Sequence, residues 1–260
     1  MIITKNISKT FGQGTRAVRA VKDVNIRIEE GERVYIHGPS GAGKSTLLHM
    51  LGGLNLPTAG TVTFRGKDVY YLRDRGKSRL RNRHFGFIFQ SYHLLPELNV
   101  LENVMLPAMI KGGESAAGIR SRAAGLLETV GMDGRLKHRP GQLSGGEAQR
   151  TAIARALVNS PDILFCDEPA GSLDSEMREG IYLLIRDISE KNGMSVVVVS
   201  HQAPDRGFFH SEYAMKDGVL GRMTNDTSEG SRETKAQMAK GFRMTDDRVQ
   251  TAEEIQYLKG

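Results

Sequence analysis

A glycine-rich loop at residues 38–46 has the residue types that bind phosphate groups. It reads Gly-Pro-Ser-Gly-Ala-Gly-Lys-Ser-Thr; an apolar run precedes it and a helical pattern follows it. In that setting the glycines let backbone N–H groups converge on an anion, and the helix N-terminus adds positive potential. Lys44 supplies a charge for the β- and γ-phosphates, and the Ser45 hydroxyl suits Mg²⁺. The predicted nucleotide contacts are Gly38, Ser40, Gly41, Ala42, Gly43, Lys44, Ser45 and Thr46.

Two carboxylates, Asp167 and Glu168, end the apolar run 163–167 and are followed by Pro169. An acidic pair at such a position is usually a cap or a salt-bridge partner. Beside a phosphate loop this changes, because ligands of parallel sheets lie at the carboxyl ends of the strands. We therefore expect Asp167 to hold Mg²⁺ through water. Glu168 is expected to orient and polarise the water that attacks the γ-phosphate.

Two further polar side chains are expected at the same edge of the sheet. His201 follows the apolar run 195–200, and Gln90 closes the run 85–89. His201 is predicted to contact the γ-phosphate, and the Gln90 amide to ligate Mg²⁺ or water. The predicted catalytic residues are thus Glu168, His201 and Gln90, and the predicted metal ligands are Ser45, Gln90 and Asp167.

A second candidate anion site lies at Ser144-Gly145-Gly146, where an alanine-rich helix begins that extends to Val158. Ser144 is a good N-cap, and Glu147 is placed as its capping-box partner. Capping does not explain two glycines in the first turn, which lower helix stability. Close approach to an anion would explain them. Because this segment lies in a different subdomain from the phosphate loop, we expect it to contact a γ-phosphate held by a second copy.

The phosphate loop, the Leu-Ser-Gly-Gly-Glu segment at 143–147 and the acidic strand end, in this order, resemble the ATP-binding-cassette (ABC) ATPases. The resemblance covers about residues 2–223. It implies that Gln90 belongs to the Q-loop, and that Glu168 is the catalytic carboxylate. It also implies that Ser144, Gly145 and Gly146 form the signature motif, which binds the partner's ATP. Residues 171–174, with Asp174, would be the D-loop that contacts the other copy of the dimer. His201 would be the switch histidine, and Phe11 the aromatic residue that stacks on adenine. For Phe11, burial in a small sheet is the alternative.

Residues 87–96, 100–104 and 138–147 are similar to the lipoprotein-releasing and macrolide-exporting ATPases of that family. The resemblance implies ATP and Mg²⁺ as cofactors, a head-to-tail homodimer, and membrane permease subunits through which a substrate is exported or a lipoprotein extracted. The branch also contains a cell-division ATPase that moves no substrate, so a non-transporting regulatory ATPase stays open as the alternative. An ATPase acting on DNA or ribosomes usually has a zinc insertion, a coiled coil or a second cassette, which this sequence lacks.

The apolar pattern predicts an α/β fold. The first 31 residues alternate as antiparallel strands do, the runs 163–167 and 195–200 are typical of buried parallel strands, and helical spacing dominates from 92 to 158. We expect a P-loop (RecA-like), mostly parallel core with an N-terminal antiparallel β subdomain and an inserted α-helical subdomain at about 91–159. Residues 1–224 are assigned to one ATPase domain, and 225–260 to a polar C-terminal tail without an assigned role.

The composition of the chain limits the classes of partner that we expect. The chain has 260 residues, 39% of them hydrophobic, and a formal net charge of +6, which alone does not choose among nucleic acid, anionic lipid and phosphate-rich ligands. We expect its basic run 65–84 to be a solvated helix face or linker. Few aromatics are interleaved in this run for base stacking, so we expect no nucleic-acid partner. The single cysteine, Cys166, excludes a disulfide framework.

Apolar runs such as 196–199 are too short to span a bilayer, and the N-terminus lacks a secretory signal pattern. We therefore expect a cytoplasmic protein that is peripheral on the cytoplasmic face of the membrane and touches the membrane only through its partners. The expected docking surface is an apolar cluster near Gln90, which comprises Tyr92, Leu94, Leu95, Leu98 and Met105.

Overall fold

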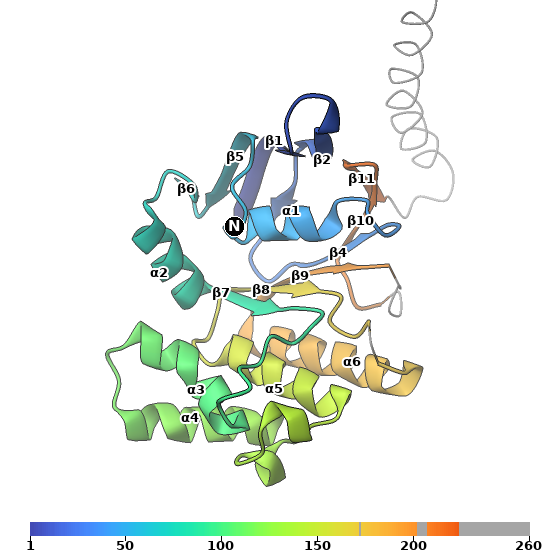
Figure 1. Ribbon diagram of the computed structural model, residues 1–260. Coiled ribbons are helices and arrows are strands. Elements are labelled where there is room, and N and C mark those ends of the chain that lie inside the picture. Colours follow the sequence, from blue (N-terminus) through green and yellow to red (C-terminus); the bar gives the residue numbers. More distant parts are fainter. Residues whose placement is uncertain (172, 202–206, 224–260) are drawn as a thin grey trace, which may run out of the picture.

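The computed structural model describes residues 1–171, 173–201 and 207–223. It is layered: a small antiparallel sheet lies above a central sheet, one helix is packed between them, another lies at the side, and the other long helices cover the opposite face of the central sheet (Figure 1). The proposed tail, 225–260, lies outside the described residues.

The central sheet has six strands in the order β11-β10-β4-β9-β8-β7. Neighbours from β10 to β7 are parallel, and only β10 and β11 pair antiparallel. Every residue of β8 and β9 is buried, because helices or strands cover both faces of the sheet. The bounds are β4 Arg33–His37, β7 Phe85–Ile88, β8 Ile163–Asp167, β9 Ser195–Ser200, β10 Ser211–Lys216 and β11 Val219–Met223.

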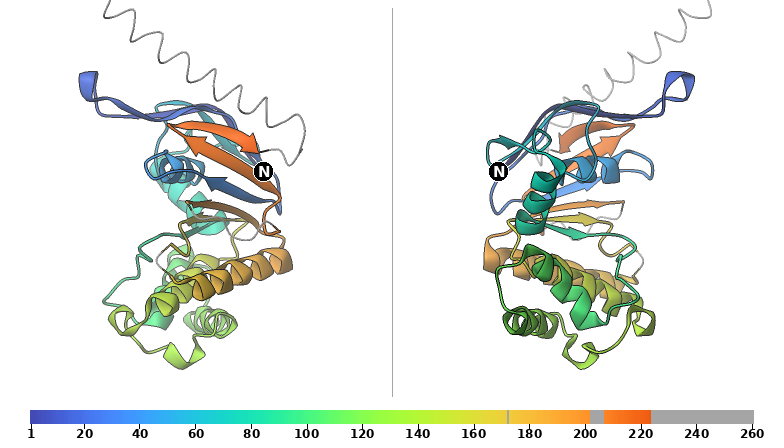
Figure 2. Two further views of the ribbon diagram at one scale, coloured as in Figure 1. Left: turned by 90° about the vertical axis from the view of Figure 1, so that its right-hand side faces the viewer. Right: turned by 60° about the vertical axis from the view of Figure 1, so that its left-hand side comes forward.

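The N-terminal sheet has the order β2-β1-β5-β6, with β3 also paired to β1, and all its pairs are antiparallel. The pair of β1 with β2 projects from the body of the molecule as a hairpin (Figure 2). The bounds are β1 Ile2–Phe11, β2 Val18–Val24, β3 Arg27–Ile28, β5 Ala59–Phe64 and β6 Lys67–Asp68. The prediction of antiparallel strands at the N-terminus is confirmed.

Two hydrophobic clusters stabilise the layers. The upper one joins both sheets to α1 through fully buried side chains such as Ile7, Leu47 and Val199. The lower one joins the central sheet to α3, α4, α5 and α6, and the inward positions of α6, Ile181 and Ile185, are one turn apart. The helices are α1 Lys44–Leu51, α2 Asp74–His84, α3 Val100–Lys111, α4 Ala116–Thr129, α5 Gly145–Leu157 and α6 Ser175–Asn192. The predicted α/β fold class is confirmed.

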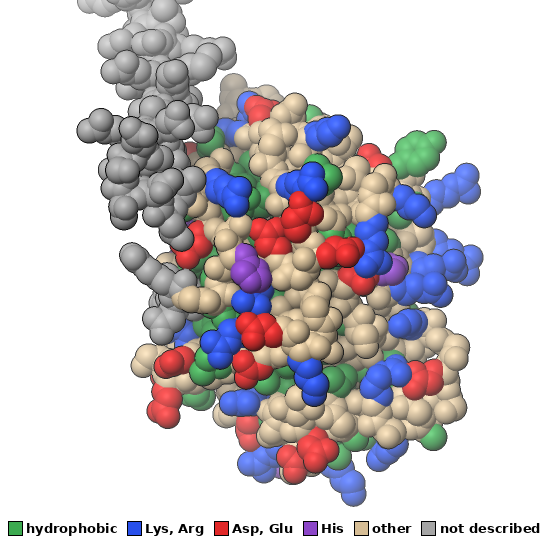
Figure 3. Space-filling model, turned by 180° about the vertical axis from the view of Figure 1, so that it is seen from behind, with side chains coloured by type: hydrophobic (Ala, Val, Ile, Leu, Met, Phe, Trp, Pro, Cys, Tyr) green, Lys and Arg blue, Asp and Glu red, His purple; other side chains and the backbone are tan. Residues whose placement is uncertain are grey.

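The basic run at 65–84 forms β6, a loop and α2, and α2 buries none of its residues completely. Lys and Arg side chains gather along the side of the molecule where α2 lies (Figure 3). The part of the run in α2 thus forms a partly exposed helix face, and the rest is β6 and a loop. In the part of the chain that the structure describes, we find no helix with the length and hydropathy needed to cross a membrane.

Candidate functional site

The phosphate loop connects β4 to α1, and two of its glycines are required by close backbone packing. A Cβ atom at Gly38 would lie 2.0 Å from the carbonyl oxygen of Met215 in β10. At Gly43, where φ is +100°, it would lie 2.1 Å from the carbonyl oxygen of Ala20 in β2. No side chain fits at either distance, so the loop is fixed between β10 of the central sheet and β2 of the N-terminal sheet. The N-terminus of α1 then opens directly onto the loop.

The loop borders a hollow of about 610 Å³ at the carboxyl edge of the central sheet. The hollow is lined by Ala20, Pro39, Ser40, Gly41, Ala42, Gly43, Lys44, Ser45, Thr46, Gln90, Glu168 and His201. The structure thus brings the side chains predicted from β7, β8 and β9 to the phosphate loop. Lys44 is buried, and its Nζ donates to the carbonyl oxygens of Gly38 (2.8 Å) and Pro39 (3.0 Å).

Ser45 and Asp167 meet beside the hollow. The Ser45 hydroxyl donates to Oδ1 of Asp167 at 2.8 Å. Burial raises the pKa of the Asp167 carboxyl, while the hydrogen bond from Ser45 and the charges of His49 and Lys44 act in the opposite direction. A hydroxyl, a carboxylate and the nearby Gln90 amide are hard oxygen donors, and Mg²⁺ prefers such donors. The residues therefore fit Mg²⁺.

No cluster of three or more His, Cys, Asp or Glu side chains that could enclose a metal occurs among the described residues. A magnesium ion bound through one or two protein oxygens and nucleotide phosphates does not need such a cluster. The donor set at Ser45 and Asp167 is compatible with this second type of site.

Glu168 and His201 form a hydrogen-bonded pair. Nδ1 of His201 lies 2.8 Å from Oε1 of Glu168, and the backbone N–H of His201 donates to the same oxygen at 3.0 Å. The Ser200 hydroxyl donates to Oε2 at 2.7 Å. Glu168 has the left-handed φ of 48°, which turns its side chain from β8 towards β9. The carboxylate is therefore held in one orientation at the mouth of the hollow.

Several predicted contacts do not line the hollow. Phe11 ends β1 with a half-exposed ring, and Lys9 Nζ lies 5.2 Å from the ring centre. Asp174 caps α6 by accepting from the N–H of Met177. Ser144, Gly145 and Gly146 lie at the N-terminus of α5. The signature and D-loop residues were expected to serve a second copy, and Ser172 of the D-loop lies outside the described residues.

The N-terminus of α5 has the predicted capping box: the Ser144 hydroxyl accepts from the N–H of Glu147, and the Glu147 carboxylate accepts from the N–H of Ser144. A Cβ atom at Gly145 would lie 3.1 Å from the Tyr92 hydroxyl, and one at Gly146 would lie 3.1 Å from the Met177 sulfur. Both glycines thus also have an intramolecular packing reason, which the sequence alone did not indicate.

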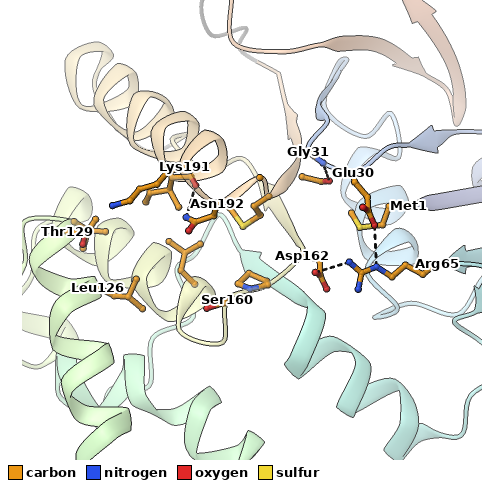
Figure 4. Close-up of a pocket in the computed structure, with 17 residues that line it drawn as sticks. Met1, Glu30, Gly31, Arg65, Leu126, Thr129, Ser160, Asp162, Lys191 and Asn192 are labelled. Atoms are coloured by element: carbon orange, nitrogen blue, oxygen red, sulfur yellow. Dashed lines mark hydrogen bonds and ion pairs between the residues drawn. The ribbon is translucent and has the colours of Figure 1, made fainter.

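A second cavity, of about 400 Å³, lies at the opposite edge of the central sheet, where β8 and β9 begin. Figure 4 shows Arg65 between Glu30 and Asp162, with Lys191 and Asn192 on the far side. The charges near the small sheet neutralise one another, and the cavity is separated from the phosphate loop by the length of the strands. It is not part of the candidate site.

Sequence reasoning missed four residues around the site: Ala20, Pro39, His49 and Ser200. Ala20 has no signal in the sequence, because only the fold brings β2 to the loop. His49 does have one: it is four residues after Ser45 on α1, so both share a helix face. The pairing of Ser200 with Glu168 depends on β8 and β9 being neighbours.

Comparison with known proteins gives a consistent result. The family described as ABC transporter matches residues 21–171. Lipoprotein-releasing system ATP-binding protein LolD of Syntrophotalea carbinolica is 50% identical over 203 residues, which is 78% of this chain and 89% of that protein. LolD of Shewanella denitrificans is 45% identical over 82% of this chain and 91% of its own length.

Solved structures agree. The dimeric structure of MJ0796, described as a bacterial ABC transporter cassette, superposes with a TM-score of 0.80 at 40% identity, over 87% of this chain and all of that one. A post-hydrolysis dimer of the same cassette, bound to ADP and Pi, gives a TM-score of 0.80 at 39% identity. The expectation of an ABC-type ATPase is confirmed at the level of the family: the chain belongs to the ABC transporter family.

Proposed function

We propose that this chain is the ATP-hydrolysing subunit of an ABC transporter that extracts lipoproteins or exports a substrate through partner permease subunits. The observation that supports it most is the convergence of three strand ends, β4, β8 and β9, on one hollow. The first delivers the phosphate loop, the second Glu168 and the third His201. The curated relatives cited above are named as subunits of a lipoprotein-releasing system.

In this proposal the loop N–H groups and Lys44 bind the triphosphate. Lys44 then exchanges the carbonyl oxygens of Gly38 and Pro39 for β- and γ-phosphate oxygens. Ser45, Asp167 and Gln90 would hold Mg²⁺, which when bound neutralises charge on the transferred phosphoryl group. Glu168 orients the attacking water and accepts its proton, while His201 holds Glu168 and reaches the γ-phosphate.

The nucleotide is shared between two copies in our proposal. Ser144, Gly145 and Gly146 are not in the hollow of their own chain, so they are available to a γ-phosphate bound by a partner. The dimeric state of the solved relative supports this arrangement. We propose that ATP closes the head-to-tail homodimer and that hydrolysis loosens it, with Asp174 near the dimer contact and Phe11 stacked on adenine.

We propose that permease subunits dock at a groove of about 450 Å³ between α2, α3 and β7. The groove is lined by Leu54, Phe87, Phe89 and His93, and the strongly exposed Ile110 lies at its border. The groove adjoins the expected cluster, in which Leu95 is exposed and Met105 packs against the core. The protein would be peripheral on the cytoplasmic face of the membrane. We further propose that 1–224 is one ATPase domain, with its helical part at about 91–159.

Replacement of Glu168 by Gln tests the proposed function. We expect ATP binding to persist, because the triphosphate contacts remain. Turnover should fall by about 10²–10⁴-fold, since Gln cannot accept the proton of the water. Phosphate release and binding of a fluorescent ATP analogue measure the two quantities. Glu179→Gln, an exposed position on α6, is the control. Unchanged turnover in Glu168→Gln would remove Glu168 from its role.

A further inference from the structure

His49, which the proposed mechanism does not use, lies next to the carboxylate of Asp167, the proposed magnesium ligand. It is on α1 one turn after Ser45, and its Nε2 is 3.6 Å from Oδ2 of Asp167. This nitrogen is shielded from solvent and has no hydrogen-bond partner within the part of the chain that the structure describes. A buried polar atom without a partner is unusual in a folded protein, so its direction is informative.

The two oxygens of Asp167 face two side chains of the same helix. Oδ1 accepts the Ser45 hydroxyl, and Oδ2 faces His49. Ser45 and His49 are four residues apart on α1, so they lie on the same face of the helix. Because Oδ1 and Oδ2 belong to one carboxylate, a rotation about the Cβ–Cγ bond would change both contacts at once. Asp167 is buried, so little bulk solvent competes with these two contacts.

The position of the His49 imidazole ring is restricted by an aromatic neighbour. Its ring lies 6.1 Å from the ring of Phe89, at an interplanar angle of 59°. Phe89 in turn contacts the ring of His93 at 4.9 Å, and both line the groove between α2, α3 and β7. The aromatic neighbour restricts the histidine ring, so that Nε2 stays directed at the carboxylate.

We propose that His49 is a positioning residue for the magnesium site: the contact of its Nε2 with Oδ2 of Asp167, at 3.6 Å, limits rotation of the carboxylate, so that the carboxylate presents one geometry to the metal. The proposal rests on the proposed role of Asp167 in holding Mg²⁺. Groups that orient a metal-binding side chain typically change metal affinity by about 10–100-fold when they are removed. A histidine that only filled space would affect folding, and its loss would affect nucleotide binding with and without metal alike.

The test compares nucleotide binding in EDTA with binding across a Mg²⁺ titration, using the full chain, a non-hydrolysable ATP analogue and calorimetry. His49→Phe and His49→Leu both remove Nε2, and the first keeps an aromatic ring. We expect unchanged affinity in EDTA and a shift of about tenfold or more to higher Mg²⁺ concentration. His49→Gln, whose amide nitrogen has a similar reach, should restore most of the magnesium response.

The matched control is His84→Phe. His84 also pairs with an aspartate, since its Nδ1 lies 2.6 Å from Asp162, but it does so at the opposite edge of the sheet. It should leave the Mg²⁺ dependence unchanged. A wild-type Mg²⁺ dependence in His49→Phe or His49→Leu would overturn the proposal. Equal losses in EDTA and in Mg²⁺, accompanied by a lower melting temperature, would also overturn it.

Asp167→Asn separates this inference from the proposed function. If Asp167→Asn shifts the Mg²⁺ dependence and the His49 variants do not, only the role of His49 fails. If Asp167→Asn itself leaves the Mg²⁺ dependence as in wild type, the assigned magnesium site fails, and the role of His49 fails with it.

Discussion

At the scale of single residues, the candidate catalytic carboxylate is held by contacts within its own chain. Glu168 accepts hydrogen bonds from Ser200 and from the backbone of His201, and its Oε1 also faces the His201 imidazole. Its left-handed backbone costs on the order of 1 kcal/mol for a residue that is not glycine. The rest of the fold offsets this strain. The left-handed backbone directs the carboxylate in one orientation towards the hollow.

Gly43→Ala tests the packing of the phosphate loop. Both φ (+100°) and the 2.1 Å approach to the Ala20 carbonyl exclude a side chain, so the backbone of the loop must move. Gly41→Ala is the matched control, because φ is +79° there but no atom lies within 4 Å of the added carbon.

For Gly41→Ala we expect a loss of unfolding free energy of about 1–2 kcal/mol, from backbone strain alone. Gly43→Ala should lose about 3 kcal/mol or more and should no longer bind ATP, because the clash adds to the strain. Urea unfolding measures the first quantity and a fluorescent nucleotide the second. Equal destabilisation by the two variants would contradict the packing argument.

At the scale of elements, the N-terminus of α5 is the exposed end of a well-capped helix. Ser144 and Glu147 satisfy each other's backbone N–H groups, and Arg135 binds the Glu147 carboxylate at 2.9 Å. The end of the helix therefore keeps its geometry without a ligand. Such a preformed end suits an anion that arrives on another molecule.

Ser144→Arg tests whether α5 faces a second copy. The long side chain should block approach of a partner's γ-phosphate while the phosphate loop of the same chain still binds ATP. Ser115→Arg is the control, since Ser115 caps α4 in the same way and loses a similar cap, worth about 1 kcal/mol.

Light scattering in a Glu168→Gln background, where ATP should accumulate in the closed state, reports the dimer. We expect a dimer with Ser115→Arg and a monomer with Ser144→Arg. An ATP-dependent dimer in Ser144→Arg would refute the assignment in trans.

The capping box also predicts a pH dependence. The backbone hydrogen bond from Ser144, and then the bond from Arg135, lower the pKa of the Glu147 carboxyl below its ordinary value. A carboxyl with a lowered folded-state pKa stabilises the protein above its unfolded-state pKa, of about 4.3. That contribution is lost as the pH falls through the lower, folded-state pKa. The difference in melting temperature between wild type and Glu147→Ala should therefore be larger at neutral pH than in acid; a constant difference would contradict it.

Elements could be predicted from the sequence where one local pattern decides the outcome. The runs 163–167 and 195–200 have the residue types of fully buried strands, and both form over those residues. The hairpin of β10 and β11 was missed, although its turn, Asp217-Gly218, has positive φ at both residues and is a typical two-residue hairpin sequence. The pairing of Glu168 with His201 could not be predicted, because it depends on strand order.

At the scale of the whole molecule, one helix connects the candidate dimer surface with the candidate permease groove. Ser144 caps the N-terminus of α5, and near the other end of the helix Arg155 donates hydrogen bonds to the carbonyl oxygens of Tyr92 and His93, just after Gln90. Burial lowers the pKa of Arg155, and two carbonyl oxygens bind its guanidinium. A movement of the segment after Gln90 would therefore also move α5, the helix whose N-terminus is proposed to face the partner copy.

Ile110→Asp tests the groove as the permease docking surface. Ile110 is 69% exposed on α3, so the substitution should cost little stability, and basal ATP hydrolysis by the isolated protein should not change. Its charge should oppose burial of the groove against an apolar partner segment, because an unpaired carboxylate is costly to bury. Permease subunits produced together with the chain should then no longer co-purify in detergent. Val219→Asp, 40% exposed on β11, is the matched control and should keep them. Equal retention of the permease by both variants would place the docking surface elsewhere. The hydrogen bonds of Arg155 would then not connect the dimer surface with a permease contact.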